Sequence, residues 1–172
     1  MIQYQSKHLS ADHNLDVLDC GSSALDDWFR RFARHAEATN TGRTFVWVDP
    51  TSLVVVGYFT LAAHLLRRVE VPKGIGHGSP EVIPAILLAR LALDHSLQGQ
   101  GLGGQLLLDA LERAVDASTR AAARFIVVDA IDDAAIQFYR RYGFRSCPNP
   151  RRLVRKTSEV NTALNGGDLP VF

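Results

Sequence analysis

A stretch of four glycines in seven residues constrains this chain more than any other segment. Gln98–Gly104 reads Gln-Gly-Gln-Gly-Leu-Gly-Gly; it follows an apolar run, Ala85–Leu93, and precedes a leucine-rich helical pattern that begins at Leu106. Glycine permits left-handed backbone conformations and lets a ligand approach the backbone closely. The first turn of a helix offers N–H groups without intrahelical partners and the positive end of the helix dipole. The order strand, glycine turn, helix therefore predicts a site for a phosphate-bearing ligand.

Composition limits the class of protein. The 172 residues are 47% hydrophobic and 22% charged, with a net charge of +1, which is typical of a globular protein and excludes a globally basic nucleic-acid binder. The two cysteines, Cys20 and Cys147, lack metal-ligand spacing, so we expect free thiols and no metal. We find no leader and no apolar run of about 18 residues. These features predict a cytoplasmic protein that does not associate with membranes.

Hydrophobic periodicity predicts a mixed α/β fold. Strands are expected at 2–6, 44–48, 53–61, 85–93, 124–128, 144–147 and 153–155, and helices at 24–38, after the glycines and from Asp132 to Tyr142. Strand, crossover helix and strand in succession indicate one right-handed parallel crossover in an otherwise mostly antiparallel sheet, flanked by helices. We expect one domain over residues 1–160, a long polar loop at 65–84, and a poorly ordered tail at 161–172.

Two helices have predicted buried and exposed faces. The apolar face of the first helix is expected to hold Leu25, Trp28, Phe29, Phe32 and Ala36. Its opposite face would carry Asp26 and Asp27, paired four residues on with Arg30 and Arg31. The helix after the glycines is expected to turn Asp109, Glu112, Arg113 and Asp116 toward solvent.

Two common phosphate-binding motifs do not explain the glycines. A Walker A loop needs Gly-Lys-Ser/Thr, whereas Gly104 is followed by Gln105 and Leu106. Gly99, Gly101 and Gly104 match the dinucleotide fingerprint G-x-G-x-x-G literally. In that fold, however, the strand runs directly into the first glycine, and here Asp94–Gln98 intervene. The context therefore argues against a dinucleotide site.

The surroundings of the loop resemble the GCN5-related N-acetyltransferases, the GNAT family. Leu91–Asp94, followed by Gln98, Gly101 and Gly103, is similar to the family's acetyl-coenzyme A (acetyl-CoA) signature, Arg/Gln-x-x-Gly-x-Gly/Ala. The resemblance implies an acyl-CoA N-acyltransferase fold and acetyl-CoA as co-substrate. It places the donor contacts at Leu91, Ala92, Leu93, Gln98, Gly99, Gln100, Gly101, Leu102, Gly103, Gly104 and Asp132.

A second family pattern lies downstream in the same register. The family often has Asn-x-x-Ala-x-x-x-Tyr-x-x-x-Gly-Phe, and this chain has Ala135, Tyr139, Gly143 and Phe144 at those offsets, with Asp132 in place of the asparagine. The resemblance gives Tyr139 the role of the acid that protonates the departing coenzyme A sulfur. A packing role in an aromatic helix face is the alternative for this tyrosine.

A narrower resemblance concerns the acceptor. Leu18–Gly21, Leu25–Trp28, Gly57–Leu61 and Leu88–Asp94 are similar to the acetyltransferase toxins of bacterial type II toxin–antitoxin modules. That resemblance implies acetylation of aminoacyl-tRNA, which blocks translation. It also implies a ribbon–helix–helix antitoxin from the same operon, operator DNA bound only through the antitoxin complex, and a homodimer.

Basic residues are concentrated near the C-terminal end. Between Ala134 and Thr157 there are seven basic residues and no acid, which indicates an acidic partner surface. Our candidate tRNA contacts are Arg30, Arg34, Arg90, Arg140, Arg141, Arg145, Arg151 and Arg152. A solvated surface, or a contact for an acidic antitoxin tail, are the alternatives for this patch. For the whole chain, acetylation of a small amine or a protein N-terminus, and a non-catalytic binding module, also remain open.

Overall fold

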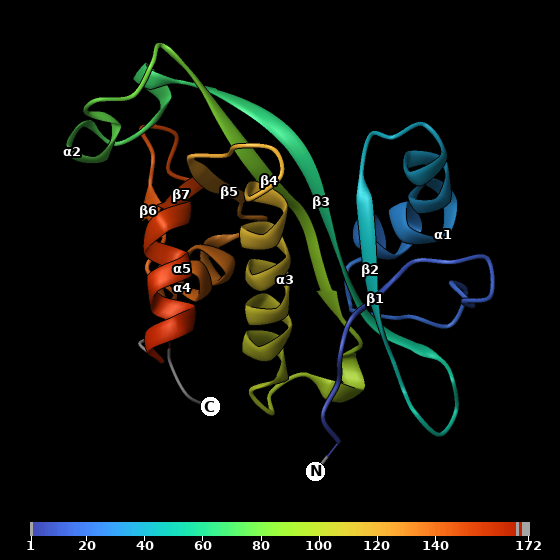
Figure 1. The fold of residues 1–172 in the computed structure, drawn as a ribbon. Helices are drawn as coiled ribbons and strands as arrows, with labels where there is room; N and C mark the ends of the chain where they lie inside the picture. The colour runs from blue at the N-terminus through green and yellow to red at the C-terminus, as the bar shows by residue number, and fades with distance from the viewer. Residues whose placement is uncertain (1, 168, 170–172) are drawn as a thin grey trace. The chain divides into compact units, whose positions relative to one another are not determined.

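The computed structural model describes residues 2–167 and 169 (Figure 1). In chain order the elements are β1 (Lys7–His8), α1 (Ser23–Ala38), β2 (Arg43–Val48), β3 (Val55–Arg67), the short 3-10 helix η1 (Arg68–Glu70), α2 (Lys73–Gly76), β4 (Val82–Leu93), η2 (His95–Leu97), α3 (Leu102–Ser118), β5 (Phe125–Asp129), α4 (Asp133–Arg141), β6 (Arg145–Ser146), β7 (Arg152–Lys156) and α5 (Thr157–Gly166). The predicted α/β class is confirmed.

The chain divides into two units, and the long strands β3 and β4 contribute to both. Unit 1 contains residues up to Ala62 together with Ala89–Ala110; its strand order is β1-β2-β3-β4. Unit 2 contains Ala63–Leu88 and the chain from Leu111 onward, with the order β3-β4-β5-β7-β6. β1 with β2, β2 with β3, β5 with β7 and β6 with β7 are antiparallel, whereas β4 and β5 are parallel. The mixed sheet with a parallel crossover is as predicted.

Unit 1 is built around the packing of α1 on its strands. Ser22 caps α1 by accepting a hydrogen bond from the Leu25 N–H. Phe29 is fully buried and stacks on the ring of Tyr58, with 4.2 Å between ring centroids. The Tyr58 hydroxyl donates to the Leu25 carbonyl at 2.7 Å. The α1 face is therefore fixed to β3 by both apolar contact and a polar bond.

An acid on α3 joins three parts of unit 1. The Asp109 carboxylate accepts hydrogen bonds from the Ser6 N–H at 2.9 Å, the Ser6 hydroxyl at 2.6 Å and the Trp47 indole N–H at 2.8 Å. Ser6 and Trp47 are both buried. We had expected Asp109 on a solvated face, and that prediction was wrong. The buried Trp47 indole N–H needs a hydrogen-bond acceptor, and Asp109 on α3 supplies it.

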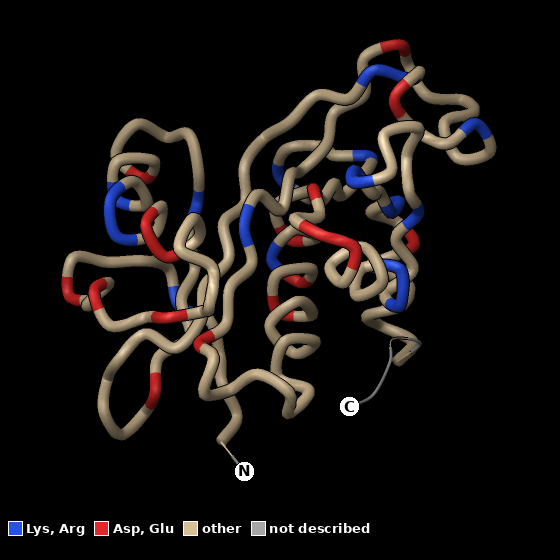
Figure 2. Tube along the Cα trace, turned by 180° about the vertical axis from the view of Figure 1, so that it is seen from behind, with Lys and Arg blue, Asp and Glu red and all other residues tan. Residues whose placement is uncertain are grey.

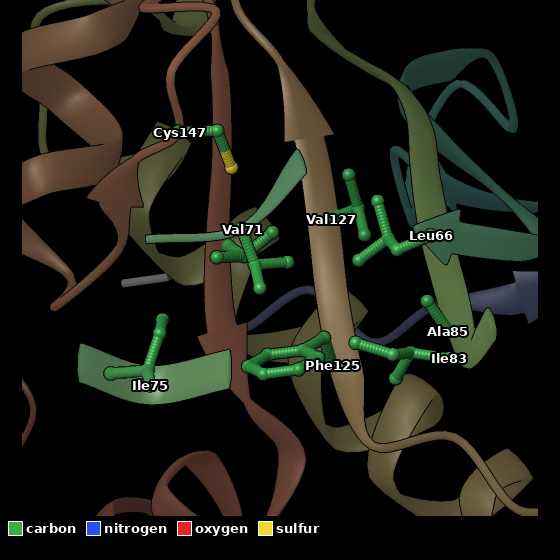
Figure 3. Packing of buried hydrophobic residues seen from close by; sticks show 9 residues of the cluster. Leu66, Val71, Ile75, Ile83, Ala85, Phe125, Val127 and Cys147 are labelled. Atoms are coloured by element: carbon green, nitrogen blue, oxygen red, sulfur yellow. The ribbon is translucent and has the colours of Figure 1, made fainter. Parts of the chain in front are cut away.

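Unit 2 has its own apolar core, shown in Figure 3. Phe125 and Val127 of β5 contribute one face of the core, where they meet Ile83 and Ala85 of β4. Leu66, Val71, Ile75, Cys147 and Val154 complete the cluster. Burial raises the pKa of the Cys147 thiol to about 11, so it stays protonated and unreactive at neutral pH.

The helix α4 has the ends that its sequence predicts. Asp132 caps it, accepting from the Ala135 N–H at 2.8 Å. Gly143 follows the helix with φ +81°, the left-handed conformation that favours glycine at this position. A Cβ here would also lie 2.8 Å from the Arg155 guanidinium carbon. Arg155 itself donates to the Tyr142 carbonyl at 2.6 Å.

Three segments differ from the sequence prediction. Residues 2–6 contain no strand, and β1 begins at Lys7. The expected loop at 65–84 is largely regular, because β3 continues to Arg67, η1 and α2 follow, and β4 starts at Val82. Residues 161–166, placed in a poorly ordered tail, are the second half of α5. Positions 168 and 170–172 of that tail lie outside the described residues.

The two faces of α1 also differ in part from the prediction. Asp26 is buried and accepts from the Cys20 N–H at 3.1 Å. Phe32 is 48% exposed. Arg30 pairs with Asp27 three residues away, at 2.9 Å, in place of the two predicted i,i+4 pairs. The buried carboxylate therefore fastens the segment before the helix.

We predict that Asp109→Ala lowers the free energy of unfolding by about 2 kcal/mol, because the buried Trp47 indole N–H loses its acceptor. Urea denaturation followed by tryptophan fluorescence measures this change. Asp116→Ala, at an exposed position of the same helix, is the matched control and should change stability by less than about 0.5 kcal/mol. Equal effects of the two substitutions would contradict the assigned role of Asp109.

Candidate functional site

The glycine loop has the backbone geometry that its sequence predicts. Gly99 and Gly101 have φ values of +76° and +79°, in the region that disfavours other residues. α3 then begins at Leu102 and runs for 17 residues. Its first-turn N–H groups have no partner within the helix, and they lie at the positive end of its dipole. The loop and helix start thus form a site suited to a phosphate group.

The side chain of Gln98 holds the loop to its own unit. Its amide donates to the Leu93 carbonyl and to the Cys20 carbonyl, both at 2.8 Å. The residue therefore joins the end of β4 and the segment before α1 to the start of the glycine loop. The side chain of Gln98 thus has a positioning role, and the prediction that Gln98 contacts the donor concerns its backbone.

Asp94 and His95 also connect the segment after β4 to the segment before α1. The Asp94 carboxylate accepts from the Ser96 N–H and hydroxyl, at 3.0 and 2.7 Å, and from the Asp19 N–H at 3.1 Å. Its partial burial raises the carboxyl pKa, but these hydrogen bonds outweigh burial and leave the pKa below its ordinary value. The His95 ring lies 3.0 Å from the Asp19 carbonyl oxygen, and this contact raises the pKa of the imidazole. We had not predicted that Asp19 would join this network.

β4 presents a backbone edge at the point where the loop begins. In unit 1 the strand order ends with β4, and the register of β4 with β5 covers Ala85–Leu88. Leu91–Leu93 lie beyond that register. A strand edge of this kind can accept an extended ligand that carries amide groups, as an additional strand.

Tyr139 lies in the aromatic cluster of α4 in unit 2. It is 8% exposed, with its ring 5.2 Å from that of Phe138 and 5.8 Å from that of Phe144. Burial raises the pKa of the phenol well above its ordinary value of 10.0. The group is therefore protonated across the physiological range and able to donate a proton. The cluster also gives the ring a packing role.

Asp132 is the predicted donor contact that lies in unit 2. Its Oδ1 atom accepts from the Ala135 N–H, so the carboxylate serves the N-terminus of α4. The carboxylate is also negative, which does not suit a phosphate. The structure accounts for this residue as a helix cap.

The basic residues of unit 1 are occupied by contacts within the unit. The Arg90 guanidinium carbon lies 3.9 Å from the centroid of the Trp28 ring, and burial lowers its pKa. Arg34 donates to the His13 carbonyl at 2.6 Å. Arg30 is paired with Asp27. These three side chains support local structure in unit 1.

The five predicted tRNA contacts of unit 2 fall into two groups, and basic positions lie along and beside α4, β6 and β7 in Figure 2. Arg152 is bidentate to Asp129, at 2.8 and 2.9 Å, and lies 3.2 Å from the His64 ring nitrogen. By contrast, the remaining four side chains are exposed. They are Arg140, Arg141, Arg145 and Arg151. Arg140 also donates to the Ser146 hydroxyl at 3.0 Å, and Arg151 donates to the Ile131 carbonyl at 2.6 Å.

His64 and Asp129 escaped the sequence analysis because their partner, Arg152, is distant in sequence. Burial is the main cause that lowers the pKa of the His64 imidazole, and the Arg152 charge adds to it. His64 is therefore neutral at pH 7, consistent with a ring nitrogen that faces a guanidinium.

Among the described residues we find no group of three or more His, Cys, Asp or Glu side chains that could hold a metal ion. Likewise, no helix in the described ranges is long and apolar enough to cross a membrane. The candidate polar groups are backbone amides in unit 1, and a phenol and guanidinium groups in unit 2.

A family model for the acetyltransferase (GNAT) domain matches residues 40–146. The match covers β2 to β6 and includes the glycine loop, β4 and α4. The chain therefore belongs to the GNAT acetyltransferase family, as the two motifs predicted.

Within the family, the chain is similar to toxins that act on tRNA. A tRNA-acetylating toxin from Mycobacterium tuberculosis is 33% identical over 142 residues, which cover 83% of this chain and 84% of that protein. The solved structure of AtaT complexed with acetyl-methionyl-tRNAfMet is 28% identical and has a TM-score of 0.84, covering 92% of this chain and 98% of that one. A tyrosine-to-phenylalanine mutant of AtaT, bound to the C-terminus of the antitoxin AtaR and acetyl-CoA, is 26% identical with a TM-score of 0.80, covering 95% and 99%.

We predict that Gly101→Ala weakens acetyl-CoA binding by about tenfold or more, because a side chain at φ +79° strains the loop that presents the amides. Isothermal titration calorimetry with acetyl-CoA measures the loss. Gly74→Ala is the matched control, since Gly74 has open space around a built Cβ and no positive φ. Undiminished affinity in Gly101→Ala would contradict the assignment of this loop.

Proposed function

We propose that this chain is a toxin N-acetyltransferase, which moves the acetyl group of acetyl-CoA to the α-amine of aminoacyl-tRNA and thereby blocks translation in the cytoplasm. The observation that carries the proposal is the 33% identity to a tRNA-acetylating toxin over 84% of that protein. AtaT, a relative of the same fold, has been solved with an acetylated aminoacyl-tRNA. Acetylation removes the nucleophilic amine that peptide-bond formation requires.

Unit 1 supplies the groups that would hold the donor. The backbone amides between Gln98 and Gly104 would bind the pyrophosphate, with Gly99 and Gly101 providing the required turn. The edge at Leu91–Leu93 would pair with the amides of the pantetheine arm. An N–H of the same strand would polarise the thioester carbonyl as its oxygen gains negative charge. In this proposal the side chains of Gln98 and Asp94 position the loop and do not touch the donor.

Tyr139 is the proposed acid. As the α-amine attacks the thioester carbonyl, the C–N bond forms and the C–S bond breaks, and the sulfur leaves as a thiolate that takes the Tyr139 proton. The attacking nitrogen loses a proton to solvent and the Tyr139 phenolate regains one from solvent, so that the amide, the free thiol and the phenol remain. A phenol with its ordinary pKa near 10 suits a thiolate of comparable basicity. Burial makes the Tyr139 phenol a weaker acid than that. The raised pKa of Tyr139 ensures that the proton is present before the reaction.

The acceptor amine needs no dedicated base in this account. An α-amine has a pKa near 8, so a useful fraction is neutral at pH 7. The exposed arginines Arg140, Arg141, Arg145 and Arg151 are proposed to contact tRNA phosphates, which gives affinity without reading the base sequence. Arg30, Arg34, Arg90 and Arg152 are also candidates. Arg90 and Arg152 are less accessible than the others, because each is partly buried against a partner within its unit.

The proposed partners follow from the same family. AtaT has been solved with the C-terminus of its antitoxin AtaR, and we propose that an antitoxin neutralises this chain as well. We further propose that the antitoxin is of the ribbon–helix–helix type, that operator DNA is bound only through the complex, and that the enzyme is a homodimer. Light scattering of the purified chain alone tests the homodimer. The same measurement with the product of the adjacent reading frame tests the complex with the antitoxin.

Labelled acetyl-CoA tests the substrate directly. We expect the label to appear in tRNA charged with an amino acid, and to be released with the amino acid when the ester is hydrolysed at alkaline pH. Uncharged tRNA and charged tRNA with a previously blocked α-amine are the controls, and both should remain unlabelled. Transfer to polyamines or to peptide N-termini, without transfer to charged tRNA, would refute the toxin proposal and favour a small-amine or protein acetyltransferase.

The substitution Tyr139→Phe tests the proposed acid. Loss of the phenol should lower the rate of acetyl transfer between about 10²- and 10⁴-fold, while the affinity for acetyl-CoA stays within about twofold, as calorimetry would measure. Because the wild-type phenol has a raised pKa, the initial wild-type rate, corrected for hydrolysis of the aminoacyl ester, should not decline through loss of this proton as pH rises from about 7 to 9.

Tyr142→Phe is the matched control, since Tyr142 is a buried tyrosine three residues further on. We expect it to retain the wild-type rate of transfer. A Tyr139→Phe enzyme that retains its rate as well would show that Tyr139 only packs the α4 cluster. Failure to bind acetyl-CoA in the wild-type protein would favour a non-catalytic binding module.

A further inference from the structure

Unit 2 contains a hollow at the N-terminal end of β5, the end of the strand away from Asp129. This hollow of about 460 Å³ is lined by the start of β4, the end of α3, the connection into β5 and the first residues of α5. Its lining residues are Pro84, Val115, Ser118, Thr119, Ala122, Ala123, Arg124, Thr157, Ser158 and Asn161. No carboxylate is present among them. This volume falls in the range of ligand sites.

The start of α5 supplies backbone donors to this hollow. α5 is 10 residues long, and its N-terminus at Lys156 has no side-chain cap. The Thr157 N–H donates to the Arg124 carbonyl at 2.9 Å, whereas the N–H groups of Ser158 and Glu159 have no acceptor within the helix. They lie at the positive end of the helix dipole.

A buried hydroxyl is the independent observation that points to a ligand. Thr157 is 7% exposed and lines the hollow, and its Oγ1 atom has no hydrogen-bond partner among the described residues. A buried hydroxyl without a partner destabilises the folded state. The neighbouring hydroxyls differ, because Ser118 and Thr119 already donate to the Val115 and Asp116 carbonyls, both at 2.6 Å.

Arg124 adds a full positive charge. Its backbone is fixed on both sides, since its N–H donates to the Pro84 carbonyl at 2.8 Å and its carbonyl accepts from Thr157. Its side chain is exposed, with the guanidinium carbon 5.9 Å from the centroid of the Phe125 ring. Glu159, the acid of the first α5 turn, acts electrostatically on Arg155. A guanidinium, a hydroxyl and helix N–H groups are the donors that recognise a phosphoryl group.

We propose that this hollow binds a phosphoryl group through Arg124, the Thr157 hydroxyl and the N-terminal amides of α5. A phosphodiester of an RNA strand and a free phosphate present the same chemistry, and the test below separates them. The site does not depend on the proposed acetylation of aminoacyl-tRNA, because all of its residues belong to unit 2 and none belongs to the donor loop or to α4.

The first measurement uses inorganic phosphate as the probe. Titration of the full chain at constant ionic strength, followed by NMR or thermal unfolding, should give saturable binding. Arg124→Gln should weaken it by about tenfold and Thr157→Val by about fivefold. Thr157→Val should also raise the melting temperature in phosphate-free buffer, because it removes an unpartnered buried hydroxyl while keeping the side-chain shape. Arg120→Gln, an exposed arginine in the same connection that does not line the hollow, is the control.

The second measurement uses uncharged tRNA, so that its outcome is independent of acetyl transfer. If an RNA phosphodiester occupies the site, Arg124→Gln should reduce the slope of log Kobs against log salt concentration by about 1, and Arg120→Gln should change it less. A phosphate effect with an unchanged slope assigns the site to a free phosphate group. Phosphate binding that is absent, or equal in wild type and both hollow variants, overturns the proposal.

Discussion

The proposed chemistry depends on one turn, the passage from β4 to α3. Two left-handed glycines, Gly99 and Gly101, bring the chain from a strand edge to a helix N-terminus within a few residues. Gln98 and Asp94 hold that turn to the segment that precedes α1. The result is a strand edge for an amide-bearing arm, followed at once by free N–H groups for a phosphate. Neither property needs a metal or a charged side chain.

The backbone of this site could be predicted from the sequence, because glycines, capping residues and apolar periodicity act locally. Gly143 and Asp132 took the positions at α4 that local rules assign to them. The errors occurred where distant partners override a local pattern. The sequence pattern predicted solvent-exposed positions for Asp26 and Asp109. Their carboxylates instead accept hydrogen bonds from the Cys20 N–H and the Trp47 indole N–H, respectively. Long-range pairing likewise extended β3 and β4 into a stretch rich in proline and glycine.

Charge was the least predictable property. The seven basic residues between Ala134 and Thr157, with no acid among them, indicated a single surface for an acidic partner. In the structure, some of these side chains instead stabilise the fold. Arg152 is held by Asp129 and Arg155 by the Tyr142 carbonyl, so these two stabilise unit 2. A count along the sequence does not separate a guanidinium that supports the fold from one that can meet a phosphate. Arg140 and Arg151 also donate hydrogen bonds within unit 2, but their side chains, like those of Arg141 and Arg145, are exposed and can meet an acidic partner.

The central claim is that the acetyl group is attached to the α-amine of the amino acid carried by tRNA. The most direct measurement is mass spectrometry of charged tRNA that has been treated with the enzyme and acetyl-CoA and then digested with nuclease. The account predicts that the aminoacyl-adenosine fragment gains the mass of one acetyl group and that every other nucleoside is unchanged. An acetyl group on a tRNA base, or an unmodified aminoacyl-adenosine, would contradict it.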